Sequence, residues 1–182
     1  ILAGDINIKG RGVDWALKYF NNPVVYVPGN HEFYSGSLGY TLKKMKEKAE
    51  GTNVHILQGE AIEVNGVQFV GATLWTNYRL SGNQPLAMFD AKQRLNDFRK
   101  IRSETFSRIS PEYIAIKHME QRQKIETAIS NGKPTVVISH HAPSSGSVDP
   151  KYGISHLDAS YASNLEYMMT DNVQLWVHGH TH

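Results

Sequence analysis

Histidines that could bind a metal ion are concentrated near the end of the sequence. Six of the nine histidines lie in the final quarter, and five of them lie at or just beyond apolar runs of strand type: His140, His141, His178, His180 and His182. In α/β folds, the side chains that follow the carboxyl ends of strands form the site. If Gly179 permits a sharp turn, His180 and His182 can point into one pocket, as metal ligands do.

Further candidate ligands follow two apolar runs near the start of the chain. The run at 1–3 precedes Asp5. The run at 24–27 leads through a Pro-Gly turn into three polar residues: Asn30, His31 and Glu32. Because the chain has no cysteine, any metal must be held by nitrogen and oxygen ligands, which suit Mn²⁺, Fe²⁺/Fe³⁺ or Zn²⁺. A carboxylate can bridge two such ions about 3.5–4 Å apart.

The elements that would position these side chains alternate between strands and helices. Apolar runs of strand length recur at 1–3, 24–27, 54–57, 67–71, 134–139 and 173–178. Helical spacing occurs at 13–20 and 38–49, and a longer helix is expected from the N-cap Ser110 to Asn131. The Asn-Gly pair at 65–66 is typical of a type I′ hairpin turn, so antiparallel pairing is expected there. This alternation indicates an α/β protein.

One stretch lacks this regularity. Between 76 and 110 the sequence is polar, rich in arginine and only weakly periodic. We expect either a surface insertion near the site or a loosely packed helical excursion.

Composition limits the class of protein. The chain has 182 residues, of which 40% are apolar, enough for one sizeable core, so a single domain over 1–182 is expected. A net charge of +2 is too small to draw the protein to nucleic acid or membranes by long-range attraction. The apolar runs are far shorter than the roughly 18–20 residues of a membrane span, and the lack of cysteine leaves a cytoplasmic location favoured.

Four short blocks, taken in chain order, carry a resemblance to a known family. They are Gly4-Asp5, Gly29-Asn30-His31-Glu32, His140-His141 and Gly179-His180-Thr181-His182. Their order and strand context resemble the calcineurin-like metallophosphoesterase superfamily, nearly end to end. The runs at 74–80 and 141–144 are similar to a prokaryotic and phage-type branch of it. The resemblance implies a metallophosphoesterase-type α/β fold, a four-layer α/β/β/α sandwich with two mixed β-sheets.

The resemblance also implies metal ligands. Asp5 would bridge two ions, and three residues would complete the shell of one of them: Asn30, His140 and His180. His182 would bind the other ion. We favour His140 over His141 as the ligand because it is the first to leave the strand. In the intact protein two ions are expected, with Mn favoured over Fe, Zn and Ni.

Two catalytic residues are implied as well, together with a departure from the family pattern. His31 would stabilise the transition state or protonate the leaving oxygen, and Glu32 would orient it. The family opens with an Asp-x-His block that precedes the position of Ile1, and further strands follow its last block. We therefore expect 1–182 to be a fragment truncated at both ends, with one complete metal shell and impaired activity.

The function expected is metal-dependent hydrolysis of phosphomonoesters or phosphodiesters by a metal-activated water, with a phosphoester substrate as the partner. One alternative is a non-catalytic module that binds metal or phosphate. A nuclease of the same superfamily is the other, and its only candidate surface is the segment 92–108, where six basic residues surround Phe98 and Phe106. Asp97 and Glu104 dilute that charge, so no clear nucleic-acid surface is expected, and no membrane partner.

Overall fold

The computed structural model describes residues 1–149 and 154–181. Its strands are β1 (Val24–Tyr26), β2 (Gly36–Ser37), β3 (Val54–Ile56), β4 (Ala61–Val64), β5 (Val67–Ala72), β6 (Ile101–Arg102), β7 (Thr135–Ser139) and β8 (Val173–His178). Its α-helices are α1 (Arg11–Tyr19), α2 (Leu38–Ala49), α3 (Gln84–Arg94), α4 (Asp97–Lys100) and α5 (Pro111–Ile129). Short 3₁₀ turns are η1 (His31–Phe33), η2 (Ser145–Ser147), η4 (Asp158–Ser160) and η5 (Glu166–Met168). The α/β class is confirmed.

Two sheets carry the fold. β1 and β3 are parallel, and Leu2 joins them through a single parallel bridge to Tyr26. The second sheet has the order β4-β5-β7-β8 and is mixed, because β4 runs antiparallel to β5 around the expected hairpin while the other pairs are parallel. The expected strand at 1–3 is reduced to that one bridge. Gly4 and Asp5 take φ values of 87° and 58°, which turn the chain out of the ladder.

Side-chain caps explain where the longer helices begin. The hydroxyl oxygen of Ser37 accepts a hydrogen bond from the backbone N–H of Tyr40 at the start of α2. Ser110 does the same for Tyr113 at the start of α5, and Pro111 occupies the first helical position, where its missing N–H has no cost. The helices expected at 38–49 and after Ser110 are confirmed.

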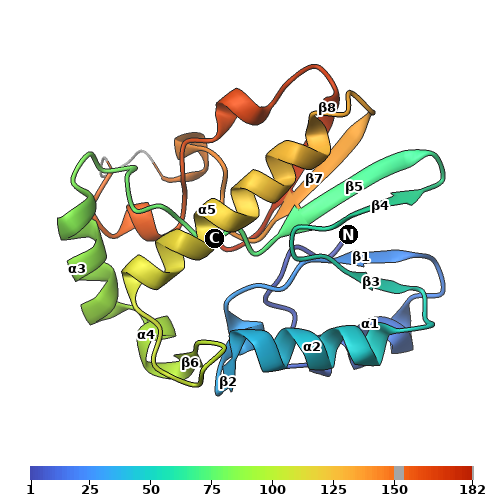
Figure 1. Cartoon of the computed structure of the whole chain (residues 1–182), viewed down its shortest axis with the longest axis horizontal. Helices are drawn as coiled ribbons and strands as arrows, with labels where there is room; N and C mark the ends of the chain where they lie inside the picture. Colours follow the sequence, from blue (N-terminus) through green and yellow to red (C-terminus); the bar gives the residue numbers. More distant parts are fainter. Residues whose placement is uncertain (150–153, 182) are drawn as a thin grey trace.

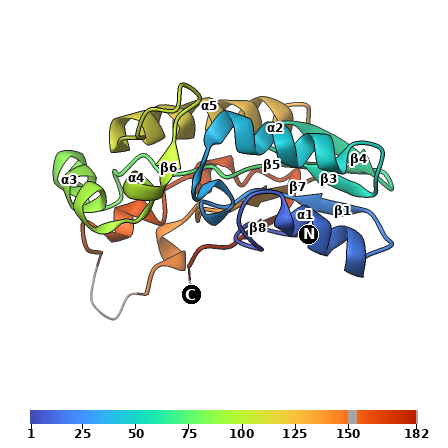
Figure 2. The same ribbon diagram turned by 90° about the horizontal axis from the view of Figure 1, so that it is seen from below.

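The two main sheets face each other, with helices on their outer sides (Figures 1 and 2). α1 and α2 cover the sheet of β1 and β3 through Val13 and Met45, while α5 covers the other sheet through Ile125 and Ile129. Val25, Val27 and Ile138 fill the layer between the sheets. Each such buried aliphatic side chain stabilises the fold by about 1.5–3 kcal/mol relative to an exposed position. The four-layer α/β/β/α arrangement is confirmed.

The segment 76–110 is part of the packed core. Its residues Ala87, Ala91, Phe98 and Ile101 lie in one buried cluster with Trp75. The segment is helical in part, as one of the two expectations had it, but its helices α3 and α4 are packed rather than loose. The periodicity is weak because the buried residues of α3 are only two small alanines, which contribute little apolar signal to a polar helix.

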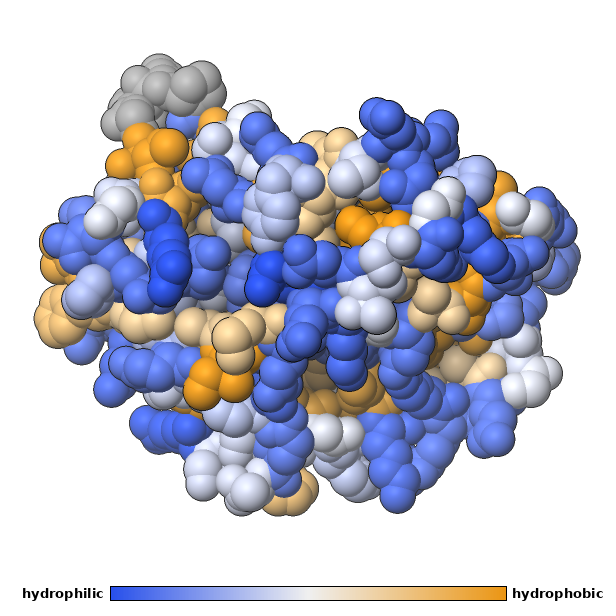
Figure 3. All heavy atoms as spheres, turned by 45° about the horizontal axis from the view of Figure 1, so that its top comes forward, coloured by the Kyte–Doolittle hydropathy of each residue, from blue (hydrophilic) through white to orange (hydrophobic). Residues whose placement is uncertain are grey.

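The surface is largely polar. Hydrophilic side chains cover most of the face drawn in Figure 3, with small apolar patches between them. Among the described residues, no helix combines the length and the apolar character needed to cross a membrane.

Candidate metal centre

Three side chains from three distant parts of the chain form a group that could hold a metal ion. Asp5, His140 and His180 each offer one ligand atom, and these atoms lie within 4.8 Å of one another. His140 Nε2 is 3.3 Å from Asp5 Oδ2 and 3.0 Å from Asn30 Oδ1. Four of the five side chains expected to bind metal thus lie together. The fifth, His182, lies outside the described residues.

The hydrogen bonds of His140 indicate why a cation fits here. Its Nδ1 lies 2.7 Å from the carbonyl oxygen of Ala3, which can only accept, so Nδ1 carries the proton. Nε2 of a neutral ring then presents a lone pair to the oxygens of Asp5 and Asn30, which are acceptors too. Three lone pairs that face one another repel unless a proton or a metal ion lies between them. Carboxylate, amide and imidazole donors are those that Mn²⁺, Fe²⁺ and Zn²⁺ accept.

Asp5 is held in its charged form. Burial by itself would raise its pKa, but a proton on His140 Nε2, which donates to the carboxylate and carries positive charge, and the backbone N–H of His31 outweigh burial, so the pKa lies below its ordinary value. The carboxylate is thus ready to bind a cation at neutral pH.

Three glycines allow the backbone segments to approach one another. A Cβ on Gly29 would lie 2.2 Å from Asp5 Oδ1, and one on Gly4 would lie 2.4 Å from His140 Nδ1. A Cβ on Gly179 would lie 2.7 Å from the carbonyl oxygen of Ala3. The glycines at these turns therefore permit the close packing of the ligand-bearing loops, because any side chain there would push the loops apart.

His31 lies beside the group and faces solvent. Its backbone N–H donates to Asp5 Oδ1 at 2.9 Å, and its Nδ1 is 3.9 Å from Asp5 Oδ2. The side chain is 52% exposed, and its ring packs on Tyr34 with the centroids 4.5 Å apart. The imidazole can therefore reach a bound substrate while one face rests on an aromatic ring.

Glu32 has a different environment from the one expected. It is fully buried and accepts five hydrogen bonds of 2.7–3.2 Å, from four backbone N–H groups and one hydroxyl: Asp5, Ile6, Asn7, Gly29 and Tyr26. Both carboxylate oxygens are engaged by these donors, so among the described contacts the Glu32 carboxylate holds the surrounding backbone, and that it orients His31 stays a prediction. Glu32 clamps the turn that carries Asp5 against the turn before Asn30.

His141 lies behind the group. It is buried, its Nδ1 is 3.2 Å from the carbonyl oxygen of Thr73, and its ring is 4.2 Å from that of His180. Burial, followed by the neighbouring His180 and His140, lowers its pKa well below the usual value. The structure thus places His140, the favoured histidine of the pair, with Asp5 and His180, and keeps His141 as a neutral packing residue.

Asp97 is the residue at this site that sequence reasoning missed. It comes from α4, is buried, and its Oδ1 accepts hydrogen bonds from Asn30 Nδ2 at 2.9 Å and from the Tyr34 hydroxyl at 2.8 Å. Burial raises the pKa of Asp97, partly offset by these two hydrogen bonds. In the sequence it follows Asn96 in a charged segment, where nothing distinguishes it from a solvated aspartate.

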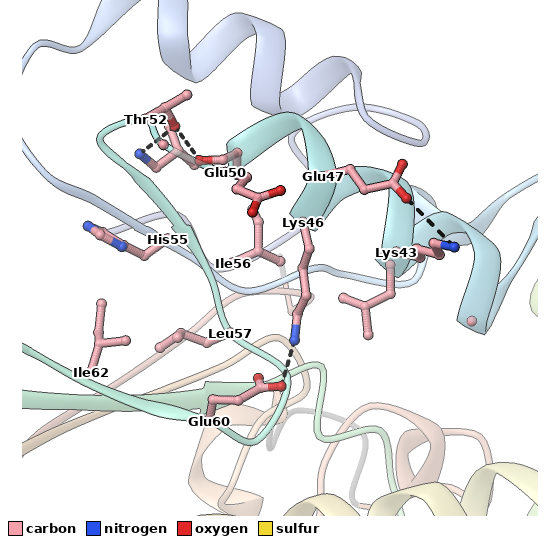
Figure 4. Close-up of a pocket in the computed structure, with 15 residues that line it drawn as sticks. Lys43, Lys46, Glu47, Glu50, Thr52, His55, Ile56, Leu57, Glu60 and Ile62 are labelled. Atoms are coloured by element: carbon pink, nitrogen blue, oxygen red, sulfur yellow. Dashed lines mark hydrogen bonds and ion pairs between the residues drawn. The ribbon is translucent and has the colours of Figure 1, made fainter.

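A cleft of about 380 Å³ opens onto the metal group, lined by Asp5, His31 and His180 together with Asp158 and Tyr161. A larger groove of about 740 Å³ lies elsewhere, between α2 and the strands β3 and β4 (Figure 4). The Lys46–Glu60 ion pair, at 2.6 Å, crosses that groove. Since Asp5 and His180 line the smaller cleft and neither of them lines the groove, the smaller cleft is the candidate catalytic site.

The four-layer sandwich and the cluster of carboxylate, amide and imidazole groups match the fold and the ligand types that the resemblance in the sequence implies. The chain belongs to the calcineurin-like phosphoesterase family, whose model matches residues 1–182. The resemblance seen in the sequence is thereby confirmed, and family membership supports phosphoester hydrolysis as the general activity.

Two known proteins are similar along the whole chain. The uncharacterized protein L509 of Acanthamoeba polyphaga mimivirus is 27% identical over 207 residues, which cover 100% of this chain and 70% of that protein. The crystal structure of phosphopantetheinyl hydrolase (PptH) from Mycobacterium tuberculosis superposes with a TM-score of 0.72 and 17% identity, covering 99% of this chain and 71% of the other. At that identity the second likeness shows the fold.

Proposed function

We propose that this protein hydrolyses phosphoric monoesters or diesters at a metal centre formed by Asp5, Asn30, His140 and His180. The observation that carries the proposal is the convergence of acceptor atoms on His140 Nε2, 3.3 Å from Asp5 Oδ2 and 3.0 Å from Asn30 Oδ1. Such a set of lone pairs is suited to a cation and poorly suited to an empty pocket.

In the intact protein this centre would hold two ions, of which Mn²⁺ is favoured; Asp5 would serve as a ligand to both, and His182 would be a ligand to the second. The ions, when bound, supply a water of lowered pKa and neutralise charge on the phosphoryl oxygens. The protein contributes the fixed geometry of the ligands. The Glu32 clamp holds the Asp5 turn through its backbone N–H groups, and the hydrogen bond to Ala3 fixes the tautomer of His140.

His31 is the proposed general acid. Its exposed imidazole borders the cleft beside Asp5, where it can donate a proton to the departing alkoxide oxygen. Such a donor contributes roughly 10²–10⁴-fold to the rate, and more when the leaving group is strongly basic.

The first test is hydrolysis of p-nitrophenyl phosphate and of its bis-ester by metal-free protein, with Mn²⁺ and with EDTA. Mn²⁺-dependent turnover that His180→Ala abolishes would support the proposal, and the preferred ester would separate monoesterase from diesterase. His55→Ala, in the groove away from the metal group, serves as the matched control and should leave turnover unchanged. Mn²⁺ binding without turnover on either ester would favour a non-catalytic metal-binding module.

The role of His31 is tested by varying the leaving group. Phenyl phosphate releases a more basic oxygen than p-nitrophenyl phosphate and depends more on a proton donor. His31→Ala should therefore lower kcat by roughly 10²–10⁴-fold with phenyl phosphate and by clearly less with p-nitrophenyl phosphate. Equal losses on both esters would contradict the assignment of His31 as the acid.

A further inference from the structure

The segment 97–102 contacts the metal group through the hydrogen bond between Asp97 and Asn30, and it is firmly anchored there. β6 pairs with β2 through Gly36 and Ile101, and the N–H of Ser35 donates to the carbonyl oxygen of Lys100 at 2.9 Å. Phe98 and Ile101 are buried in the core cluster. Because backbone pairing and core packing both fix this segment, the carboxylate of Asp97 has a defined position beside η1.

Asn30 needs a partner that decides which way its side-chain amide faces. The two ends of a carboxamide have nearly the same size, so packing alone does not distinguish oxygen from nitrogen. A donor at the metal position would be useless, whereas Oδ1 there is a ligand. Asp97 accepts from Nδ2 at 2.9 Å, and a carboxylate cannot donate, so the nitrogen must face Asp97 and the oxygen must face His140.

The same carboxylate oxygen also holds Tyr34. The Tyr34 hydroxyl donates to Asp97 Oδ1 at 2.8 Å. The Tyr34 ring packs against the imidazole of His31, and the ammonium group of Lys100 lies 5.0 Å from the ring centroid. One buried acceptor therefore fixes both the amide of Asn30 and the aromatic ring on which His31 rests.

We propose that Asp97 is a positioning residue of the metal centre, which turns the Asn30 amide so that its oxygen is available as a ligand. The inference rests on the proposed function, because it assumes that a metal ion binds at Asn30. It assigns a role in the site to the segment 76–110. Loss of such an outer partner lowers metal affinity by roughly 10–100-fold.

The test measures Mn²⁺ binding to metal-free protein by titration calorimetry, alongside thermal unfolding. Asp97→Ala should raise the Kd for Mn²⁺ up to about 100-fold. Asp97→Asn keeps the side-chain volume and one acceptor oxygen but removes the charge, so it should raise the Kd about tenfold. Asp90→Asn, on α3 and outside the network, is the control for the same loss of charge and should leave the Kd unchanged.

A double-mutant cycle separates positioning from a general structural role. If Asp97 acts through Asn30, adding Asp97→Ala to Asn30→Ala should change the Kd by less than about twofold, because the amide it orients is already gone. An equal loss in both backgrounds would overturn the proposal. If Asp97→Ala does not fold, the same cycle is measured with Asp97→Asn. A Kd for Mn²⁺ of the Asp97→Asn variant equal to that of the Asp90→Asn control would then overturn the proposal.

The experiment also distinguishes this inference from the proposed function. If the unaltered protein binds no Mn²⁺, Fe²⁺ or Zn²⁺, the metal centre itself is refuted and the positioning role with it. If the unaltered protein binds Mn²⁺ and both Asp97 variants bind it equally well, the centre stands and the role of Asp97 is refuted.

Discussion

Replacing Glu32 with glutamine would remove one acceptor oxygen from the middle of five hydrogen bonds. Glu32 Oε1 accepts three of them and Oε2 accepts two, from the N–H groups of Asp5 and Gly29. In its better orientation, the glutamine amide nitrogen takes the place of Oε2 and faces those two N–H groups. Two hydrogen bonds are then replaced by contacts between donors, in a fully buried position.

The expected cost follows from this count. Hydrogen bonds to charged groups contribute about 1.5–3 kcal/mol each, so the loss of two lowers the free energy of unfolding by about 3–6 kcal/mol. Domains of this size are stable by about 5–15 kcal/mol, so the variant should fold only marginally. The turn that carries Asp5 should loosen at the same time, because two of the five donors flank it directly.

Urea denaturation of metal-free protein measures this loss without interference from metal binding. Glu120→Gln is the matched control, since Glu120 lies on the surface of α5 and pairs with Lys117 at 3.0 Å. Its loss should cost less than about 1 kcal/mol. If Glu32→Gln were as stable as this control but turned over substrate more slowly, Glu32 would act on the chemistry, and its role as a structural clamp would be refuted.

Two further perturbations test the packing around the site and the response to pH. Gly29→Ala places a Cβ 2.2 Å from Asp5 Oδ1 and 2.7 Å from His140 Cε1, so the Mn²⁺ affinity measured by calorimetry should fall at least tenfold. Gly10→Ala is the control and should leave the affinity unchanged, because its Cβ would lie 3.6 Å from the nearest side-chain atoms, those of Lys48. Burial lowers the pKa of His118 to about 4, so its contribution to stability is present above pH 6.5 and is lost as the pH falls towards 4. Between pH 7 and pH 5 the free energy of unfolding, measured by urea denaturation, should fall by about 2 kcal/mol more in the unaltered protein than in the His118→Gln variant. Equal losses in the two proteins would contradict a buried, neutral His118 imidazole.

The strongest sequence predictions concern features with local causes. The N-cap at Ser110 and the helix spacing at 38–49 depend on neighbours within a turn, and both helices begin where expected. The weakest concern the segment 76–110. There, the packing depends on two alanines of α3 and on the short helix α4. Whether the segment is buried depends on contacts with residues far away in the sequence.

The sequence by itself determined three features: the alternation of strands and helices, the family, and the types of side chain at four strand ends. Each of them can be recognised from short stretches of neighbouring residues. Only the tertiary structure decided what those side chains contact. Glu32 bonds to donors up to 27 residues away, and Asn30 meets Asp97 across 67 residues. These contacts depend on how sheets and helices that are distant in the sequence pack against one another. Local sequence patterns therefore do not predict them.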